Sequence, residues 1–135
     1  MIRFFGDAFY WIALNNKRDA EHARVKMFAE TFPEIVVVTT DEVLTELLAF
    51  YSRKPSLRAG AVETVRAMLG DENVSVIAQS RRSFLDGLEL YEARPDKGYS
   101  LTDCISMQTM RREGLSDVLT NDRHFEQEGF RAVFR

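Results

Sequence analysis

The stretch "EIVVVTTDEVLTELLAFYS", residues 34–52, decides the fold class. Its first part, residues 34–38, is an unbroken run rich in β-branched residues, which is typical of a strand buried on both faces. Thr39 or Thr40 can then cap a helix. Apolar residues follow at helical spacing, namely Val43, Leu44, Leu47, Leu48, Phe50 and Tyr51. A buried strand that leads directly into an amphipathic helix is typical of a parallel α/β protein.

The same strand-then-helix pattern recurs on both sides of this stretch. Further strands are expected at residues 2–5, 74–78, 117–120 and 130–134. Further helices are expected at residues 8–15, 18–32, 57–69, 82–94 and 100–114. This alternation predicts a single α/β domain with a mostly parallel sheet of about five strands and helices on both faces. Right-handed crossovers would place the carboxyl end of every strand at one edge of the sheet.

Length, charge and cysteine content exclude several classes of protein. The chain has 135 residues, 45% hydrophobic content and a net charge of −3, with a pI of about 5.4. It therefore lacks the strongly basic balance of a protein that binds nucleic acid by bulk electrostatics. No apolar run approaches the roughly 18 residues that a membrane span needs. Cys104 is the one cysteine, so we expect no internal disulfide and a cytoplasmic location.

Four acidic residues stand out by their position relative to the predicted strands. Asp7 follows the first strand directly, and Asp122 ends the segment "VLTND" at residues 118–122. Glu46 lies at the border of the apolar arc of its helix, and Asp103 lies in line with an apolar stripe. In open parallel sheets, ligands bind just outside the carboxyl ends of the strands. We therefore expect these acids to converge on one edge.

Each acid also has a purely structural explanation. Asp7 could cap the following helix, and Asp103 could form a capping box with Ser100. Glu46 could be a charge at the rim, and Asp122 could begin a turn. Converging acids, however, would repel one another and raise at least one pKa unless a cation compensated them. Carboxylate oxygens with few histidines suit Mg²⁺ or Mn²⁺, so the sequence predicts a divalent-metal site.

Neighbouring side chains complete the candidate site. Thr120 lies two residues before Asp122, on the same side of an extended segment, so its hydroxyl could join the acids. Arg123 follows directly and is our main candidate for contact with the substrate, with Arg81–Arg82 as weaker candidates. We interpret His124 as a residue of a surface loop.

Two further features are assigned to packing. The aromatic run Phe9–Trp11 could stack on bases, but in a helix of a small domain it more often belongs to the core or to a dimer interface. Cys104 has no partner cysteine or histidine motif and is expected to be buried and unreactive.

In their order along the chain, four segments resemble the PIN domain family, and within it the short VapC-like toxin ribonucleases. These segments are "GDAFYWIAL" (6–14), "TTDEVLTELL" (39–48), "SLTDCISM" (100–107) and "VLTNDRHFEQEGF" (118–130). The last is the most specific of them, and the resemblance covers nearly the whole chain.

This resemblance implies one PIN-like domain over residues 1–135 that acts as a Mg²⁺- or Mn²⁺-dependent endoribonuclease. The family's catalytic and metal-binding acids match Asp7, Glu46, Asp103 and Asp122. Thr120 matches the small hydroxyl residue of the last motif. The implied products are a 5′-phosphate and a 3′-hydroxyl. Family members are commonly homodimers, and a small antitoxin protein inhibits the toxins by covering the acidic cleft with its tail.

Three other readings compete with a nuclease. A phosphoacceptor receiver domain usually has two adjacent acids after its first strand and a lysine after its last, which this sequence lacks. A haloacid-dehalogenase-like phosphatase needs Asp-x-Asp, whereas the first strand here supplies only Asp7. A PIN-like module that binds RNA or protein without cleaving RNA remains open, because spacing shows capacity and not turnover.

Overall fold

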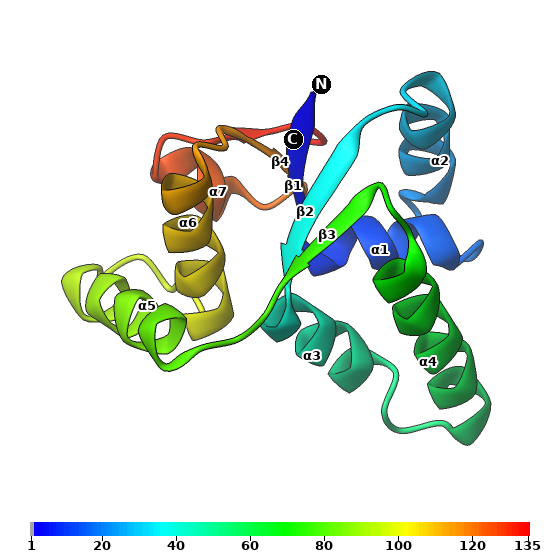
Figure 1. Ribbon diagram of the computed structural model, residues 1–135, viewed down its shortest axis with the longest axis horizontal. Coiled ribbons are helices and arrows are strands. Elements are labelled where there is room, and N and C mark those ends of the chain that lie inside the picture. Colours follow the sequence, from blue (N-terminus) through cyan, green and yellow to red (C-terminus); the bar gives the residue numbers. More distant parts are fainter. Residues whose placement is uncertain (1) are drawn as a thin grey trace.

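One parallel sheet of five strands forms the centre of the molecule. The computed structural model describes residues 2–135. The strands are β1 (Arg3–Gly6), β2 (Val36–Thr40), β3 (Val74–Ile77), β4 (Asp117–Leu119) and β5 (Arg131–Ala132). Their order across the sheet is β3-β2-β1-β4-β5, and every neighbouring pair is parallel (Figure 1). The predicted α/β fold is therefore confirmed, and the first strand lies in the middle of the sheet.

Helices cover both faces of this sheet. They are α1 (Ala8–Asn15), α2 (His22–Thr31), α3 (Asp41–Phe50), α4 (Pro55–Gly70), α5 (Arg81–Ala93), α6 (Leu101–Glu113) and α7 (Arg123–Gln127). In Figure 1, α1, α2 and α4 lie on one side of the strands, whereas α5, α6 and α7 lie on the other. Helix α3 begins where β2 ends and contacts α1, α4 and α6. The carboxyl ends of β1, β2 and β4 therefore lead to the starts of α1, α3 and α7.

An aromatic cluster fixes α1 against the rest of the core. Tyr10 and Trp11 are buried, and the Tyr10 ring packs near those of Phe28 and Phe134. The prediction that this aromatic run serves the core is confirmed for both residues. The guess that Tyr10 lies at a dimer interface is wrong, because its own chain already covers it. Gly6 ends β1 against this cluster, and a Cβ there would lie 2.6 Å from Val37 Cγ1.

Several predicted boundaries differ from the structure. The second helix was expected from residue 18, but α2 begins at His22 because turns held by the Asp19 carboxylate and carbonyl precede it. The strand expected at 34–38 lies two residues later. In α3, Leu48 and Phe50 were placed on the apolar face, yet they are 37% and 62% exposed. The sequence analysis also missed α7.

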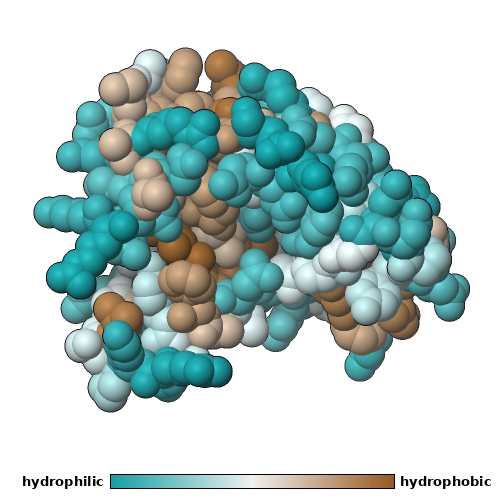
Figure 2. Space-filling view, turned by 180° about the vertical axis from the view of Figure 1, so that it is seen from behind, coloured by the Kyte–Doolittle hydropathy of each residue, from teal (hydrophilic) through white to brown (hydrophobic). Residues whose placement is uncertain are grey.

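The surface is mostly polar. Figure 2 shows a largely hydrophilic face interrupted by apolar patches. Within residues 2–135, no helix combines the length and apolar character that crossing a membrane would require. Cys104 is fully buried, and burial raises the pKa of its thiol to about 11, which agrees with the prediction of an unreactive side chain.

Candidate functional site

Asp7 lies directly after β1, in the middle of the sheet. It occupies the position before α1, but its carboxylate makes no capping hydrogen bond within residues 2–135. Instead, Asp7 Oδ2 accepts a hydrogen bond of 2.9 Å from the hydroxyl of Thr120, and the residue is only 8% exposed. The capping explanation for Asp7 therefore does not hold, because the carboxylate points to the end of another strand.

Thr120 connects two of the predicted acids. It directly follows β4, which pairs with β1, and its side chain is fully buried. Its hydroxyl donates to Asp7 and accepts a hydrogen bond of 3.2 Å from the backbone N–H of Asp122. Since one hydroxyl holds both segments, the predicted position of Thr120 beside the acids agrees with the structure.

Glu46 and Asp103 approach from two different helices. Glu46 lies in the second turn of α3 and is half-buried. Asp103 lies in the first turn of α6, where Oδ2 accepts a hydrogen bond of 3.1 Å from Ser100 N–H, and Ser100 Oγ accepts one of 3.0 Å from Asp103 N–H. This capping box is the structural role that the sequence suggested. The capping box does not bury the carboxylate completely. The Asp103 side chain is 15% exposed, so it can cap the helix and also belong to the site.

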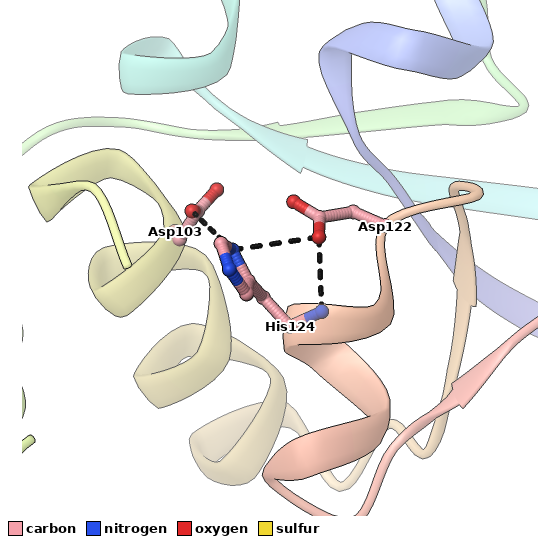
Figure 3. Close-up of side chains that lie close together, drawn as sticks. All are labelled: Asp103, Asp122 and His124. Carbon is pink, nitrogen blue, oxygen red and sulfur yellow. Dashed lines mark hydrogen bonds and ion pairs between the residues drawn. The ribbon is translucent and has the colours of Figure 1, made fainter. Parts of the chain in front are cut away.

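Asp122 and His124 lie at the start of α7, facing Asp103. Asp122 caps this helix, since its Oδ1 accepts a hydrogen bond of 2.9 Å from His124 N–H. His124 Nδ1 lies 3.4 Å from Asp122 Oδ1 and 3.8 Å from Asp103 Oδ2, so the imidazole stands between the two carboxylates (Figure 3). One ligand atom from each of the three residues lies within 4.8 Å of the others. They are the tightest potential metal-binding group among the described residues.

The interpretation of His124 as a surface-loop residue is wrong. Its side chain is 27% exposed, and its Nδ1 atom is buried without a hydrogen-bond partner within residues 2–135. The edge of the Tyr99 ring packs against the imidazole, with the ring centroids 5.2 Å apart. The missed helix α7 explains the error, because the cap at Asp122 turns the following residues back toward the site. The available signal was a histidine two residues after a strand-end acid.

The acids raise one another's proton affinity. Burial raises the pKa of Asp7 to about 7, and the carboxylates of Asp103 and Glu46 add to this effect, while the Thr120 hydrogen bond opposes it. Burial also raises the pKa of Glu46, with further contributions from Asp103 and Asp122. Burial is also the main cause of the raised pKa of Asp103. All four predicted acids are therefore close enough to form one electrostatic unit.

The protein supplies little positive charge to this unit. Within residues 2–135, none of the four acids forms an ion pair with a lysine or arginine. Carboxylate oxygens and an imidazole nitrogen with no other partner are a donor set that suits a divalent cation. The residues present therefore fit a metal ion, and the roles of Asp7, Glu46, Asp103 and Asp122 as its ligands remain a prediction.

The predicted substrate-contacting arginines lie on the exposed surface. Arg123 is the first residue of α7, next to Asp122, and its side chain is exposed. Arg81 lies over the Phe84 ring, and Arg82 pairs with Asp86 at 3.6 Å. Contact of any of these residues with RNA stays a prediction, for which Arg123 is the best placed.

Relatives with similar sequences are ribonuclease toxins. The chain is 29% identical over 127 residues to the 23S rRNA-specific endonuclease VapC20 of Mycobacterium tuberculosis, which covers 93% of this chain and 94% of the relative. The crystal structure of that VapC20, described as a sarcin–ricin loop cleaving toxin, matches with a TM-score of 0.85 and 26% identity, covering 96% of this chain and 98% of that one.

A second solved structure agrees in fold alone. VapBC2 from Rickettsia felis, bound to a DNA fragment from its promoter, matches with a TM-score of 0.70 and 15% identity, over 97% of this chain and 96% of that one. The family described as PIN domain matches residues 5–130. This range includes every acid of the site described above. The chain belongs to the PIN domain family.

Proposed function

We propose that this protein is a metal-dependent endoribonuclease that hydrolyses RNA phosphodiester bonds. The observation that carries the proposal is a group of Asp103, Asp122 and His124, with ligand atoms within 4.8 Å of one another, next to the buried Asp7, which Thr120 links to Asp122. Among residues 2–135, none of these acids has a lysine or arginine partner. Negative phosphate can approach such a site only when a cation compensates the acids. The likeness to a curated endonuclease over 93% of the chain supports the same activity.

The four acids would share the metal and the attacking water. Asp7, Asp103 and Asp122 would hold Mg²⁺ or Mn²⁺, with Glu46 either as a further ligand or as a base. When bound, such an ion polarises a phosphoryl oxygen and lowers the pKa of a coordinated water. Glu46, which is less buried than Asp7, would orient the attacking water or accept its proton. Thr120 would keep Asp7 in place through its hydrogen bond.

The relatives suggest a substrate. Because the VapC20 protein acts on 23S rRNA and is described as cleaving the sarcin–ricin loop, we propose ribosomal RNA of this kind as the target. Such RNA lies in the cytoplasm, which is the location expected for this protein.

The test compares a sarcin–ricin loop hairpin with a scrambled hairpin and a mixed RNA pool. We expect cleavage with Mg²⁺ or Mn²⁺, none in EDTA, and a loss of at least about a hundredfold in Asp7→Asn. The matched control is Glu72→Gln, an exposed acid in the turn before β3. Cleavage by Asp7→Asn at the wild-type rate would refute the assignment.

The same experiment separates the enzyme from a binding module. A PIN-like protein that only binds RNA or a protein partner would shift the hairpin in a gel but leave it intact at every metal concentration. Cleavage of the scrambled hairpin at the same rate would support the nuclease and reject the proposed target.

We further propose that the protein is the toxin of a VapBC-type pair and forms a homodimer. The VapBC2 assembly among the structural matches supports the pair, whereas the homodimer rests on the family resemblance alone. A small protein encoded next to the gene should co-purify with this chain and suppress its cleavage of RNA. Sedimentation of the isolated chain tests the dimer, since a monomeric mass at micromolar concentration would contradict it.

A further inference from the structure

One polar atom at the site has no partner in the protein. Nδ1 of His124 is buried and makes no hydrogen bond within residues 2–135. A buried polar group without a partner loses its hydration without compensation, so such atoms are uncommon unless they serve a ligand or a bound water. The atom faces Asp103 and Asp122 and not the solvent (Figure 3).

The surrounding distances suit a shared ion better than direct hydrogen bonds. Nδ1 lies 3.4 Å from Asp122 Oδ1 and 3.8 Å from Asp103 Oδ2, which is longer than an ordinary hydrogen bond. Two ligand atoms that each lie about 2.1 Å from one metal ion are about 3.0 Å apart at right angles and about 4.2 Å apart when opposed. Both observed separations fall inside this interval.

The imidazole is also held in its orientation. Tyr99 packs edge-on against it, and the Tyr99 hydroxyl donates a hydrogen bond of 3.0 Å to Glu128. Glu128 is itself fixed by Arg94 and Arg111, at 2.8 and 2.9 Å. From the other side, the backbone N–H of His124 is bound by Asp122. The Tyr99 contact and the hydrogen bond of the His124 backbone to Asp122 limit the positions that the imidazole can take.

We propose that His124 is a direct metal ligand through Nδ1, together with Asp103 and Asp122, and that it makes the site prefer Mn²⁺ to Mg²⁺. The inference rests on the proposed function, because it concerns the ion of the same site. Mg²⁺ binds oxygen ligands and keeps its waters. Imidazole suits Zn²⁺, Cu²⁺, Fe²⁺ and Ni²⁺ best, and Mn²⁺, although it also favours oxygen, belongs to the same first-row series and accepts a nitrogen ligand more readily than Mg²⁺ does. A nitrogen in the ligand set therefore favours Mn²⁺ over Mg²⁺.

The competing explanation is that His124 is only a counterion. A protonated imidazole between two carboxylates would sit in the same place and would be displaced when an ion binds. Direct coordination of nitrogen distinguishes the two explanations, because a displaced imidazole lies outside the ion's ligand shell.

Pulsed electron paramagnetic resonance of the Mn²⁺-loaded, full-length protein measures that coordination. The chain has two histidines, so an imidazole ¹⁴N coupling comes from one of two residues. His22 begins α2, and its Nδ1 lies 2.7 Å from the Ala13 carbonyl oxygen. We expect the coupling in the wild type and in His22→Gln, and its loss in His124→Gln.

Binding constants supply a second readout that is independent of RNA cleavage. His124→Gln should weaken Mn²⁺ binding by about tenfold or more, and it should change Mg²⁺ binding, measured by competition, by much less. His22→Gln should change neither constant. Circular dichroism of His124→Gln checks that the variant is folded.

The outcomes separate this inference from the proposed function. If Mn²⁺ binds stoichiometrically and supports RNA cleavage but shows no imidazole coupling, the nuclease stands and the inference is overturned. Equal weakening of Mn²⁺ and Mg²⁺ in His124→Gln would overturn the metal preference. If the wild type binds neither ion, both the inference and the metal-dependent nuclease are rejected.

Discussion

Two carboxylates in different parts of the molecule, those of Glu128 and Asp7, have pKa values that are shifted in opposite directions. Glu128, after α7, is almost fully buried, yet hydrogen bonds from Arg94, Arg111 and Tyr99 outweigh the effect of burial and lower its pKa to about 2. Asp7 is buried as a whole residue, and its burial, together with the neighbouring acids, raises its pKa to about 7. The two carboxylates differ in the charge around them and not in their chemistry.

The difference distinguishes a structural carboxylate from a candidate metal ligand. Where a carboxylate holds elements together, the chain provides its own arginines, and the negative charge is stable without help from outside. Where the chain provides no arginine or lysine within residues 2–135, the charge is costly until a cation arrives. The free-energy cost of this uncompensated negative charge therefore indicates that a cation binds at the edge of the sheet.

Removing the charge of Glu128 should have the largest effect. Glu128→Gln leaves Arg94 and Arg111 without a counterion and should lower the free energy of unfolding by about 3 kcal/mol, the lower end for a broken buried pair because both arginines reach solvent. Urea denaturation at neutral pH measures the change. The control Glu126→Gln breaks an exposed pair with Arg135 and should cost less than about 1 kcal/mol. Equal losses of stability in the two variants would contradict the structural role assigned to Glu128.

Removing the charge of Asp7 should have the opposite sign. In EDTA at pH 8, Asp7→Asn should raise the free energy of unfolding by about 2 kcal/mol, because the variant no longer keeps a buried charge and its amide oxygen still accepts from Thr120. Added Mn²⁺ should stabilise the wild type and not the variant. A destabilised Asp7→Asn in EDTA would contradict the view that this charge is costly.

The pH dependence of metal-free stability should show the same contrast. The folded pKa of Asp7, about 7, lies above 3.8, so folded protein keeps a proton that the unfolded chain loses. Stability should therefore fall as pH rises from 3.8 to 7, and this fall should shrink in Asp7→Asn. The folded pKa of Glu128, about 2, lies below 4.5, so its contribution should be lost as pH falls from 4.5 to 2.

Thr120 should give a smaller effect on both stability and metal binding. Thr120→Val removes the hydroxyl that donates to Asp7 and accepts from the Asp122 N–H. We expect a loss of about 1 kcal/mol in the free energy of unfolding and weaker Mn²⁺ binding, because Asp7 loses its orienting hydrogen bond. Thr120→Ser, which keeps a hydroxyl, should restore most of the metal affinity. Failure of serine to do so would assign the effect to packing.

Arg123 should show the smallest effect, confined to RNA. Arg123→Gln should weaken RNA binding several-fold without changing Mn²⁺ binding. The slope of the logarithm of the binding constant against the logarithm of the salt concentration should fall by about 1, the share of one phosphate contact. The control is Arg53→Gln, an exposed arginine beyond the far end of α3. If the two variants behave alike, Arg123 has no special contact with the substrate.

The sequence was sufficient for the fold class, because hydrophobic periodicity is a local signal. An unbroken run such as residues 34–38 indicates a buried strand, even though the strand itself lies at 36–40. The sequence did not show how side chains on a short helix such as α7 are oriented. His124 was misplaced because α7 has five residues, too few for a periodic pattern.

Strand pairing determines the partner of Thr120, which the sequence placed only beside the acids. Nothing local to Thr120 indicates that its hydroxyl reaches Asp7, because that contact exists only when β4 pairs with β1. The Glu128 cluster was missed for the same reason, since its partners come from segments far apart in the chain.

The central position of β1 has a consequence for synthesis. Its two neighbours in the sheet are β2 and β4, and β4 comes more than a hundred residues after β1. While β4 is still inside the ribosome, Asp7 has neither Thr120 nor Asp122 near it, so the group of acids cannot form. Under the proposed function, a nascent chain is thereby unable to cut the ribosome that is making it until β4 and the residues that follow it emerge.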